Sequence, residues 1–582
     1  MMKLFKKLDF KQLIYAFICI LFIVINVYLE LKIPESMSKL TIIIQTEGSM
    51  TSDVIHEGAF MMLCAFGSLI AAVIVGYYAA KVASNFGLVI RKEIFNKVNK
   101  FGAEEIKKFS TSSLITRTTN DVNQVQLLIA MGLQAIIRAP IMASLAISKI
   151  AGKNIMWTNT MVISVILLLI VIITIMILVL PKFKLVQKLT DNLNRITREN
   201  LIGIRVIRAF NAEDYQQKKF EKANEELKNL QLFNQKTIGL LFPFMSMISS
   251  TLSLTIYYIG ALLINEANII DKLNIFGDMI VFSSYAIQVL FSFMMLIMIF
   301  VLYPRASVSS KRILEVLETE ETIKDGEVTK GKNVGTVEFK NVSFRYPDAE
   351  EYILKDISFK VNKGETVAFI GSTGSGKSTL INLIPRFYDA TDGEVLVDGV
   401  NVKDYKLECL NNIMGYIPQK AVLFKGTVYD NVGYGDNGKK KPSRKQIEEA
   451  IKVAQARDFI EKMDNKYSSE IARGGTNISG GQKQRLAIAR AIVRNPEIYI
   501  FDDSFSALDY KTDYTLRKEL KKYTKDATNL IVASRIGTIK DADKILVLEN
   551  GNLVGIGRHD ELMKKCKVYK EIALSQLSEE EL

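Results

Sequence analysis

The stretch TVAFIGSTGSGKST, from Thr366 to Thr379, decides the fold of the second half of this chain. Its apolar start predicts a buried strand, and the residues GSTGSGKST fit the pattern GxxxxGK[ST] ahead of a helical run. In this pattern glycines let backbone amides curl around phosphates, a lysine reaches the outer phosphates, and a serine hydroxyl offers a magnesium ligand. The sequence therefore predicts a site for ATP or GTP, formed by Gly371, Ser372, Thr373, Gly374, Ser375, Gly376, Lys377, Ser378 and Thr379.

A second apolar run, 498–501, ends in Asp502, where a carboxylate can bind magnesium directly or through water. Further strand-like runs lie at 336–339, 365–370, 529–533 and 545–548, and helical runs separate them. Alternation of this kind predicts an α/β domain with a mainly parallel sheet. We expect this nucleotide-binding domain to occupy residues 336–582.

The first half of the chain has a different composition. The 582 residues are too many for one compact core, and 49% of them are hydrophobic. Apolar runs near or above the roughly 20 residues that cross a bilayer lie at about 13–33, 58–80, 127–148, 160–180, 237–264 and 277–303. The sequence predicts a helical transmembrane domain with six spans over 1–318 and a polar linker over 319–335.

Charge indicates the orientation of this domain. The net charge is +13, and lysine and arginine gather in the segments that flank the spans, notably 81–126 and 182–235. The positive-inside rule then places both termini, these two segments and the nucleotide-binding domain in the cytoplasm of a multi-pass plasma-membrane protein. We prefer this explanation of the charge to nucleic-acid binding. The four scattered cysteines and two histidines do not predict a metal centre or a disulfide framework.

One further motif points to a family. The residues ISGGQKQR, 478–485, resemble the signature sequence of ABC transporters, and SALD, 506–509, resembles their D-loop. Tyr346 matches the aromatic residue that stacks on adenine, and Gln419 in YIPQ matches the Q-loop glutamine. In the first half, 112–122, 204–214 and 305–318 resemble the coupling segments and linker of ABC exporters.

The resemblance implies a half-transporter, two of which pair and couple ATP hydrolysis to transport. Each ATP, with Mg²⁺, then lies between the phosphate loop of one chain and the signature of the other. The small residues of the signature stand at a helix N-terminus, which favours an anion. The implied nucleotide contacts in the signature are Ser479, Gly480, Gly481 and Gln482, and the implied magnesium ligands are Ser378, Gln419 and Asp502.

The chain departs from the family pattern on the γ-phosphate side. Asp503 stands where relatives carry the glutamate that activates water, and it is shorter by about 1.5 Å. Ser534 stands where they carry histidine, and 473–475 reads RGG where an acidic residue is frequent. With the signature intact, these changes favour a heterodimer that resembles bacterial heterodimeric multidrug exporters. The partner, a different half-transporter, performs most of the hydrolysis, and this chain contributes a degenerate ATP site.

Two alternatives stay open. The changes are harmless in the first, an active homodimer that exports lipids or peptides. In the second, ATP binding alone is a signal, and the chain is a regulatory or sensor subunit without turnover. The coupling segments and linker argue against the second alternative.

The last apolar run carries polar residues at helical spacing, Ser284, Gln288 and Ser292, beside an aromatic and thioethers. This stripe fits either an amphipathic, drug-like or lipid-like cargo or contacts between helices. Arg138 interrupts the third run and either has a function or extends toward the headgroups.

Overall fold

The computed structural model describes residues 2–7, 9–46, 50–150 and 154–576. The chain forms two compact units, Met1–Val98 with Ser112–Thr319 and Asn99–Thr111 with Glu320–Leu582. The main division falls beside the boundary that we predicted after residue 318. The segment 99–111, which we assigned to the transmembrane domain, instead groups with the second unit.

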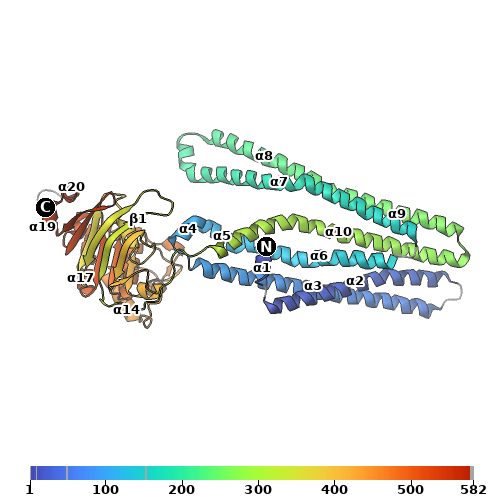
Figure 1. Cartoon of the computed structure of the whole chain (residues 1–582), viewed down its shortest axis with the longest axis horizontal. Helices are drawn as coiled ribbons and strands as arrows, with labels where there is room; N and C mark the ends of the chain where they lie inside the picture. The colour runs from blue at the N-terminus through green and yellow to red at the C-terminus, as the bar shows by residue number, and fades with distance from the viewer. Residues whose placement is uncertain (1, 8, 47–49, 151–153, 577–582) are drawn as a thin grey trace. The chain divides into compact units, whose positions relative to one another are not determined.

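Helices, most of them long, make up the first unit (Figure 1). They are α1 (Met2–Phe5), α2 (Phe10–Gln45), α3 (Thr51–Val98), α5 (Thr111–Thr116), the π-helix η1 (Arg117–Asp121), α6 (Val122–Ile150), α7 (Ile155–Ala209), α8 (Glu213–Gly239), α9 (Leu241–Glu266) and α10 (Ile269–Glu318). Among the described residues, six helical stretches are long and apolar enough to cross a membrane. This confirms the predicted six spans.

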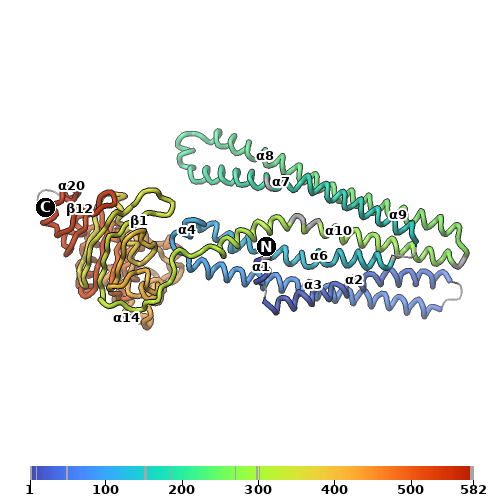
Figure 2. The backbone as a smooth tube through the Cα atoms, viewed as in Figure 1, coloured from blue at the N-terminus to red at the C-terminus, as the bar shows by residue number. Residues whose placement is uncertain are grey.

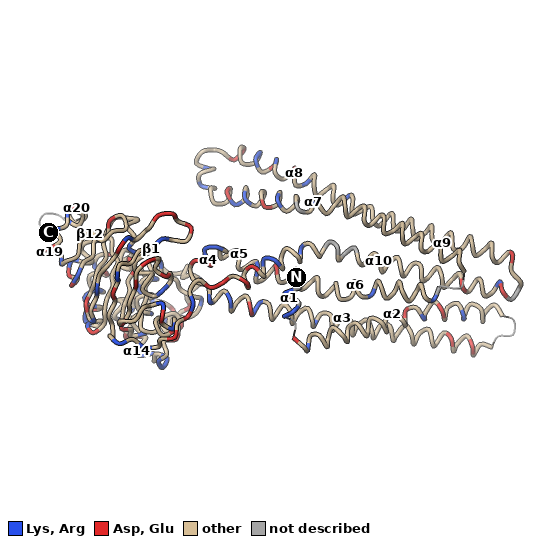
Figure 3. Tube along the Cα trace, viewed as in Figure 1, with Lys and Arg blue, Asp and Glu red and all other residues tan. Residues whose placement is uncertain are grey.

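Charge is distributed along these helices as a membrane protein requires. The middle parts of α3, α7 and α9 carry few charged residues, whereas charges are frequent in α8 and in the adjoining part of α7 (Figure 3). The 55 residues of α7 extend for about 80 Å, far more than a bilayer is thick. Its start is fixed by Asn154, whose side chain accepts hydrogen bonds from the amides of Met156 and Trp157.

Buried aromatic residues hold the membrane unit together. Trp157 is buried against Phe282, with ring centroids 4.9 Å apart, and its indole N–H donates to the Ile256 carbonyl at 3.1 Å. The Tyr285 hydroxyl donates to the Leu31 carbonyl at 2.7 Å. Each bond satisfies a buried polar group that could not otherwise enter an apolar core.

The second unit contains the predicted α/β domain, which Figure 2 traces as a smooth tube. Its main sheet has the order β12-β11-β3-β10-β9-β6, and its second sheet the order β2-β1-β4-β5. The main-sheet strands are β3 (Thr366–Gly371), β6 (Met414–Ile417), β9 (Ile498–Asp502), β10 (Thr528–Val532), β11 (Lys544–Glu549) and β12 (Asn552–Gly557). Those of the second sheet are β1 (Val337–Phe344), β2 (Leu354–Val361), β4 (Asp392–Val397) and β5 (Val400–Asn401). The main sheet is parallel except for β12, as predicted.

Alternation along the central strands explains why this sheet is covered on both faces. In β9, Ile498 and Ile500 enter one apolar cluster, whereas Tyr499 and Phe501 enter another. Successive side chains of a strand point to opposite faces, so an uninterrupted apolar run needs a cover on each side. The polar residues that follow the strands are thereby carried to one edge of the sheet, where parallel strands end together.

Candidate nucleotide-binding site

The phosphate loop joins β3 to the helix α11 (Lys377–Asn382). The Lys377 ammonium donates to the carbonyls of Gly371 and Ser372, both at 2.8 Å, so the lysine folds back over the loop. Gly376 has a φ of +96°, and a Cβ there would lie 2.8 Å from the Leu354 side chain. Both the backbone conformation and the available space therefore require glycine at this position.

Side chains that suit magnesium lie beside this loop. The Ser378 hydroxyl donates to Asp502 Oδ1 at 2.8 Å, at the end of β9, which β10 separates from β3 in the sheet. Burial raises the pKa of the Asp502 carboxyl above its ordinary value, and burial lowers the pKa of the Lys377 ammonium. A cation near Asp502 and an anion near Lys377 would each favour the charged form. The hard oxygen donors of Ser378 and Asp502 thus fit Mg²⁺, and Lys377 fits a phosphate group.

Tyr346, the residue predicted to stack on adenine, lies near the same loop. Its hydroxyl is 3.0 Å from the hydroxyl of Thr379, and its ring meets Phe344 and Tyr388 edge-on, at centroid distances of 5.0 and 5.3 Å. The Lys107 ammonium, from the segment 99–111 of the same unit, lies 5.8 Å from the ring centroid. These contacts fix the ring beside the phosphate loop.

The two residues that we predicted to depart from the family pattern, Asp503 and Ser534, meet each other in the fold. Asp503 follows β9 and Ser534 follows β10, and the Ser534 hydroxyl donates to Asp503 Oδ1 at 3.2 Å. The Gln419 amide nitrogen lies 3.5 Å from Asp503 Oδ2. Asp503 has a φ of +45°, a conformation that Asp tolerates better than most residues. Sequence alone put these residues in three separate motifs, and the structure brings them together.

The signature lies at the start of α16 (Gly480–Val493). Ser479 caps this helix: its hydroxyl accepts from the Gln482 amide at 3.3 Å, while the Gln482 side chain accepts from the Ser479 amide at 2.9 Å. Ser479 and Gly480 are exposed to solvent. The helix N-terminus is thus formed and accessible, as recognition of a phosphate by a second chain requires.

Sequence reasoning missed two parts of this unit. Tyr416, three residues before Gln419, donates its hydroxyl to the Asn382 side chain at 3.1 Å, and its own pKa is raised chiefly by burial. The helix α4 (Ala103–Phe109) belongs to the unit because buried Glu105 accepts from the Thr322 amide at 2.8 Å. The available sequence signal was the acidic Glu105 in a segment that also carries Lys100, Lys107 and Lys108.

Comparison with known proteins identifies the family. The family described as "ABC transporter transmembrane region" matches residues 16–303, and the family described as "ABC transporter" matches residues 354–506. An uncharacterized ABC transporter ATP-binding protein of Mycobacterium tuberculosis is 37% identical over 90% of this chain and 90% of its own length. The chain belongs to the ABC transporters. As an ABC transporter it is a multi-pass membrane protein that binds ATP and couples hydrolysis to transport.

The names of two other relatives of this ABC transporter state a function. A putative multidrug export ATP-binding/permease protein of Bacillus subtilis is 32% identical, over 85% of this chain and 84% of that one. An ATP-dependent lipid A-core flippase of Aliivibrio fischeri is 30% identical, over 90% and 89%. The solved structure of a bacterial Atm1-family ABC exporter with ATP bound superposes with a TM-score of 0.82 at 24% identity, covering 98% of this chain and 100% of that one. The fold is therefore that of an exporter half-transporter.

The predicted cargo residues of this ABC transporter do not line its transmembrane cavity. Ser292 is buried and donates to the Gln288 carbonyl of its own helix at 2.8 Å. A cavity of about 210 Å³ instead lies among α2, α3, α6 and α10, and its polar lining residues are Asn26, Gln134 and Arg138. Whether Ser284, Gln288 and Ser292 contact cargo stays a prediction.

Arg138, which interrupts the third apolar run, forms an ion pair with a residue of another helix. Its guanidinium donates to both carboxylate oxygens of Glu30, at 2.6 and 2.8 Å. One guanidinium nitrogen reaches both oxygens, so the ion pair joins α6 to α2 while the two side chains stay partly exposed, at 31% and 25%. The arginine and its partner are therefore a structural tie beside the cavity.

Proposed function

We propose that this chain is one half of a heterodimeric ABC exporter, with a degenerate ATP site of its own and an intact signature that serves its partner. The observation that carries this proposal is the contact between Asp503 and Ser534. The Ser534 hydroxyl donates a hydrogen bond to the Asp503 carboxylate, and this carboxylate is the group that would have to orient the attacking water. Mg-ATP is held by the loop, Ser378 and Asp502, while turnover takes place mainly at the site completed by the partner.

The short side chains at this site support slow hydrolysis. A displacement of about 1 Å in a catalytic group can lower the rate on the order of a hundredfold. Asp503 lacks one methylene of the family glutamate, and Ser534 lacks the imidazole that would donate toward the γ-phosphate. By contrast, Lys377 lies over the phosphate loop and Ser378 lies within hydrogen-bond distance of Asp502, an arrangement that supports binding of Mg-ATP. This combination supports retention of ATP with little turnover.

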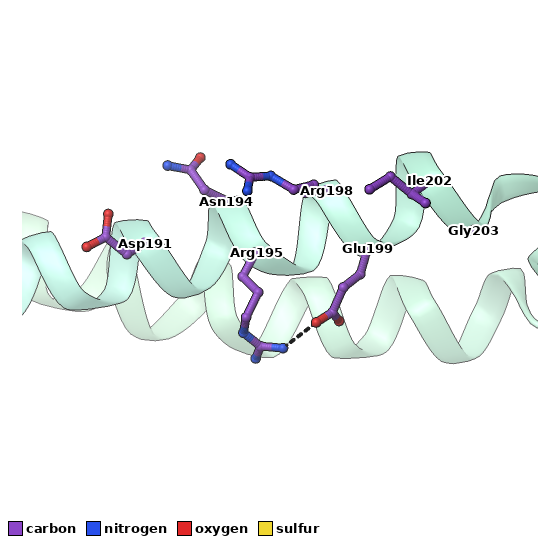
Figure 4. A pocket seen from close by; sticks show the side chains of 7 residues that line it. All are labelled: Asp191, Asn194, Arg195, Arg198, Glu199, Ile202 and Gly203. Atoms are coloured by element: carbon purple, nitrogen blue, oxygen red, sulfur yellow. Dashed lines mark hydrogen bonds and ion pairs between the residues drawn. The ribbon is translucent and has the colours of Figure 1, made fainter. Parts of the chain in front are cut away.

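An uncovered arm of the membrane unit supports pairing with a second chain. Beyond the apolar span of α7, Leu201 and Ile202 have exposed fractions of 71% and 80%, and Phe210, which follows the helix, has an exposed fraction of 78%. Figure 4 shows Ile202 on the same side of α7 as Asp191, Asn194 and Arg198, whereas Arg195 and Glu199 pair on the other. Arginines interleave with these apolar residues, so a lipid interior is an unsuitable cover. A protein partner is the suitable cover.

The cargo that we propose is an amphipathic small molecule. The transmembrane cavity combines apolar walls, among them Met131 and Met295, with the polar groups of Asn26, Gln134 and Arg138. Flexible thioethers accommodate varied shapes, and a few polar groups orient a ligand. The multidrug-export relative favours drug-like cargo, and the lipid A-core flippase relative favours a lipid exporter as the second candidate.

The test is ATP turnover in the purified complex with the second half-transporter. We expect Asp503→Ala to reduce turnover only slightly, and replacement of the partner's glutamate at the equivalent position to abolish it. The matched control is Asp502→Asn, which should weaken Mg-ATP retention at this chain's own site. Loss of turnover in Asp503→Ala equal to that in the partner variant would overturn the degenerate-site proposal. Full turnover by this chain alone would favour the homodimer.

A further inference from the structure

The nucleotide-binding unit contains a second cavity that the ATP site does not use. Its volume is about 250 Å³, and it lies between α17 (Tyr510–Tyr523), α18 (Ile536–Ile539) and the first residues of β3 and β10. Thr366, at the start of β3, lines the cavity, whereas the phosphate loop follows the end of that strand at Gly371. Five residues of strand separate the two, roughly 17 Å.

A buried acceptor without a protein donor lies in the wall of this cavity. Asn529 is only 6% exposed, and its amide nitrogen donates to the Ala527 carbonyl at 3.2 Å. Its Oδ1 has no hydrogen-bond partner within the described part of the chain. Asn529 and Ile531 both line the cavity, as expected for alternate residues that share one face of a strand. A buried acceptor of this kind is stabilised by any ligand that donates to it.

The α17 side of the cavity is largely charged, and the apolar part of the lining comes mainly from Phe505, Ile531 and Ile539. Lys518 and Lys521, three residues apart and both exposed, line the cavity together with the aromatic ring of Tyr514. Only one acidic residue, Asp541, stands among the lining residues of the described chain. Apolar walls, a positive mouth and a buried acceptor are complementary to an amphipathic anion.

The cavity is held in shape by Arg517. Its guanidinium binds both carboxylate oxygens of Asp513, each at 3.1 Å, and also donates to the carbonyls of Gly537 and Thr538 at 3.0 and 3.3 Å. These bonds join α17 to α18, the two helices that form opposite walls. The charge of Arg517 is thereby neutralised, and the charges left to attract a ligand are those of Lys518 and Lys521.

We propose that this cavity is a binding site for a small amphipathic organic anion. The apolar body of the ligand packs against Ile531 and Ile539, an N–H or O–H of the ligand donates to Asn529 Oδ1, and its anionic group meets Lys518 and Lys521. The site is separate from the ATP site and does not depend on the heterodimer proposal.

Indole-3-acetate is a suitable probe because it combines an apolar ring, one N–H donor and a carboxylate. Its binding to the full chain in lipid nanodiscs is measured by ligand-observed NMR with saturating Mg-ATP, which blocks the nucleotide site. A ligand of this size binds with a Kd on the order of 1 mM. We expect Lys518→Ala with Lys521→Ala to weaken binding about tenfold. The matched control, Lys511→Ala with Lys525→Ala, removes the same charge from exposed positions outside the cavity lining and should leave Kd unchanged.

The donor is tested without altering the protein. 1-Methylindole-3-acetate keeps the carboxylate and loses the N–H, so it should bind the natural chain about tenfold more weakly. Asn529→Leu should abolish the difference between the two probes. The proposal is overturned if indole-3-acetate shows no saturable binding, if both lysine pairs weaken it equally, or if the two probes bind alike to the natural chain.

Discussion

Restoring the family residues at positions 503 and 534 should raise ATP turnover in this chain expressed alone. Two copies would place each ATP between the phosphate loop of one copy and the intact signature of the other. In the natural chain the Ser534 hydroxyl lies 3.2 Å from Asp503 Oδ1 and the Gln419 amide 3.5 Å from Oδ2. A glutamate reaches about 1.5 Å further, and a histidine adds a donor that serine cannot place at that distance.

The size of the gain follows from those two changes. Correcting a displacement of about 1 Å is worth on the order of a hundredfold, and a donor on developing charge is worth about 100- to 1,000-fold. The effects of residues that act as a unit are not additive. We therefore expect Asp503→Glu with Ser534→His to raise turnover about 100- to 1,000-fold, or roughly 2.7–4 kcal/mol of barrier.

The assay is phosphate release by the chain in lipid vesicles, with Asp503→Asn and Ser534→Ala together as the matched control. The control should hardly differ from the natural chain, because little catalysis remains for it to remove. Adding Asp502→Asn to the restored variant should abolish the gain. The reasoning is refuted if the natural chain already turns over as fast as the restored one, or if the control loses turnover a hundredfold.

Three further outcomes follow from the described contacts. Lys377→Ala should weaken ATP binding about 10- to 100-fold, since it removes charge-assisted bonds to phosphate. Titration with a fluorescent ATP analogue measures the affinity, and an unchanged affinity contradicts the phosphate-loop assignment. Ser479→Ala should cost about 1 kcal/mol of helix capping and slow turnover of the complex, while ATP retention on this chain's own loop stays constant; filter binding separates the two effects. Arg138→Gln and Glu30→Gln should each lower the stability of the chain, measured by thermal unfolding in detergent. A double-mutant cycle should give a coupling energy of about 1–3 kcal/mol between the two residues. Additive effects would show that the ion pair does not stabilise the fold.

The predictions from sequence succeeded where a local pattern carries the chemistry. Six apolar runs became six candidate spans, and the residues around Lys377 lie between a strand and a helix as the pattern predicted, because both features depend on short contiguous stretches. Predictions that needed packing were less complete. Segment 99–111 groups with the nucleotide-binding unit through buried Glu105, a contact 217 residues apart in sequence that no local pattern reveals. The pairing of Arg138 with Glu30 could not be predicted either, because the two residues lie on different helices and are distant in sequence.

The sequence by itself determined that this chain belongs to a family that binds ATP and that it spans a membrane, and it predicted departures from the family pattern at 503, 534 and 473–475. Motif spacing and hydrophobic run length are properties of the chain before it folds. Only the tertiary structure decided that Asp503 and Ser534 lie in contact. The parallel register of β9 and β10 pairs Asp502 with Val532, so the residues that follow these strands emerge side by side although 31 positions separate them. Asn529, near the start of β10, lines a cavity together with residues of α17, and no sequence motif predicts this cavity.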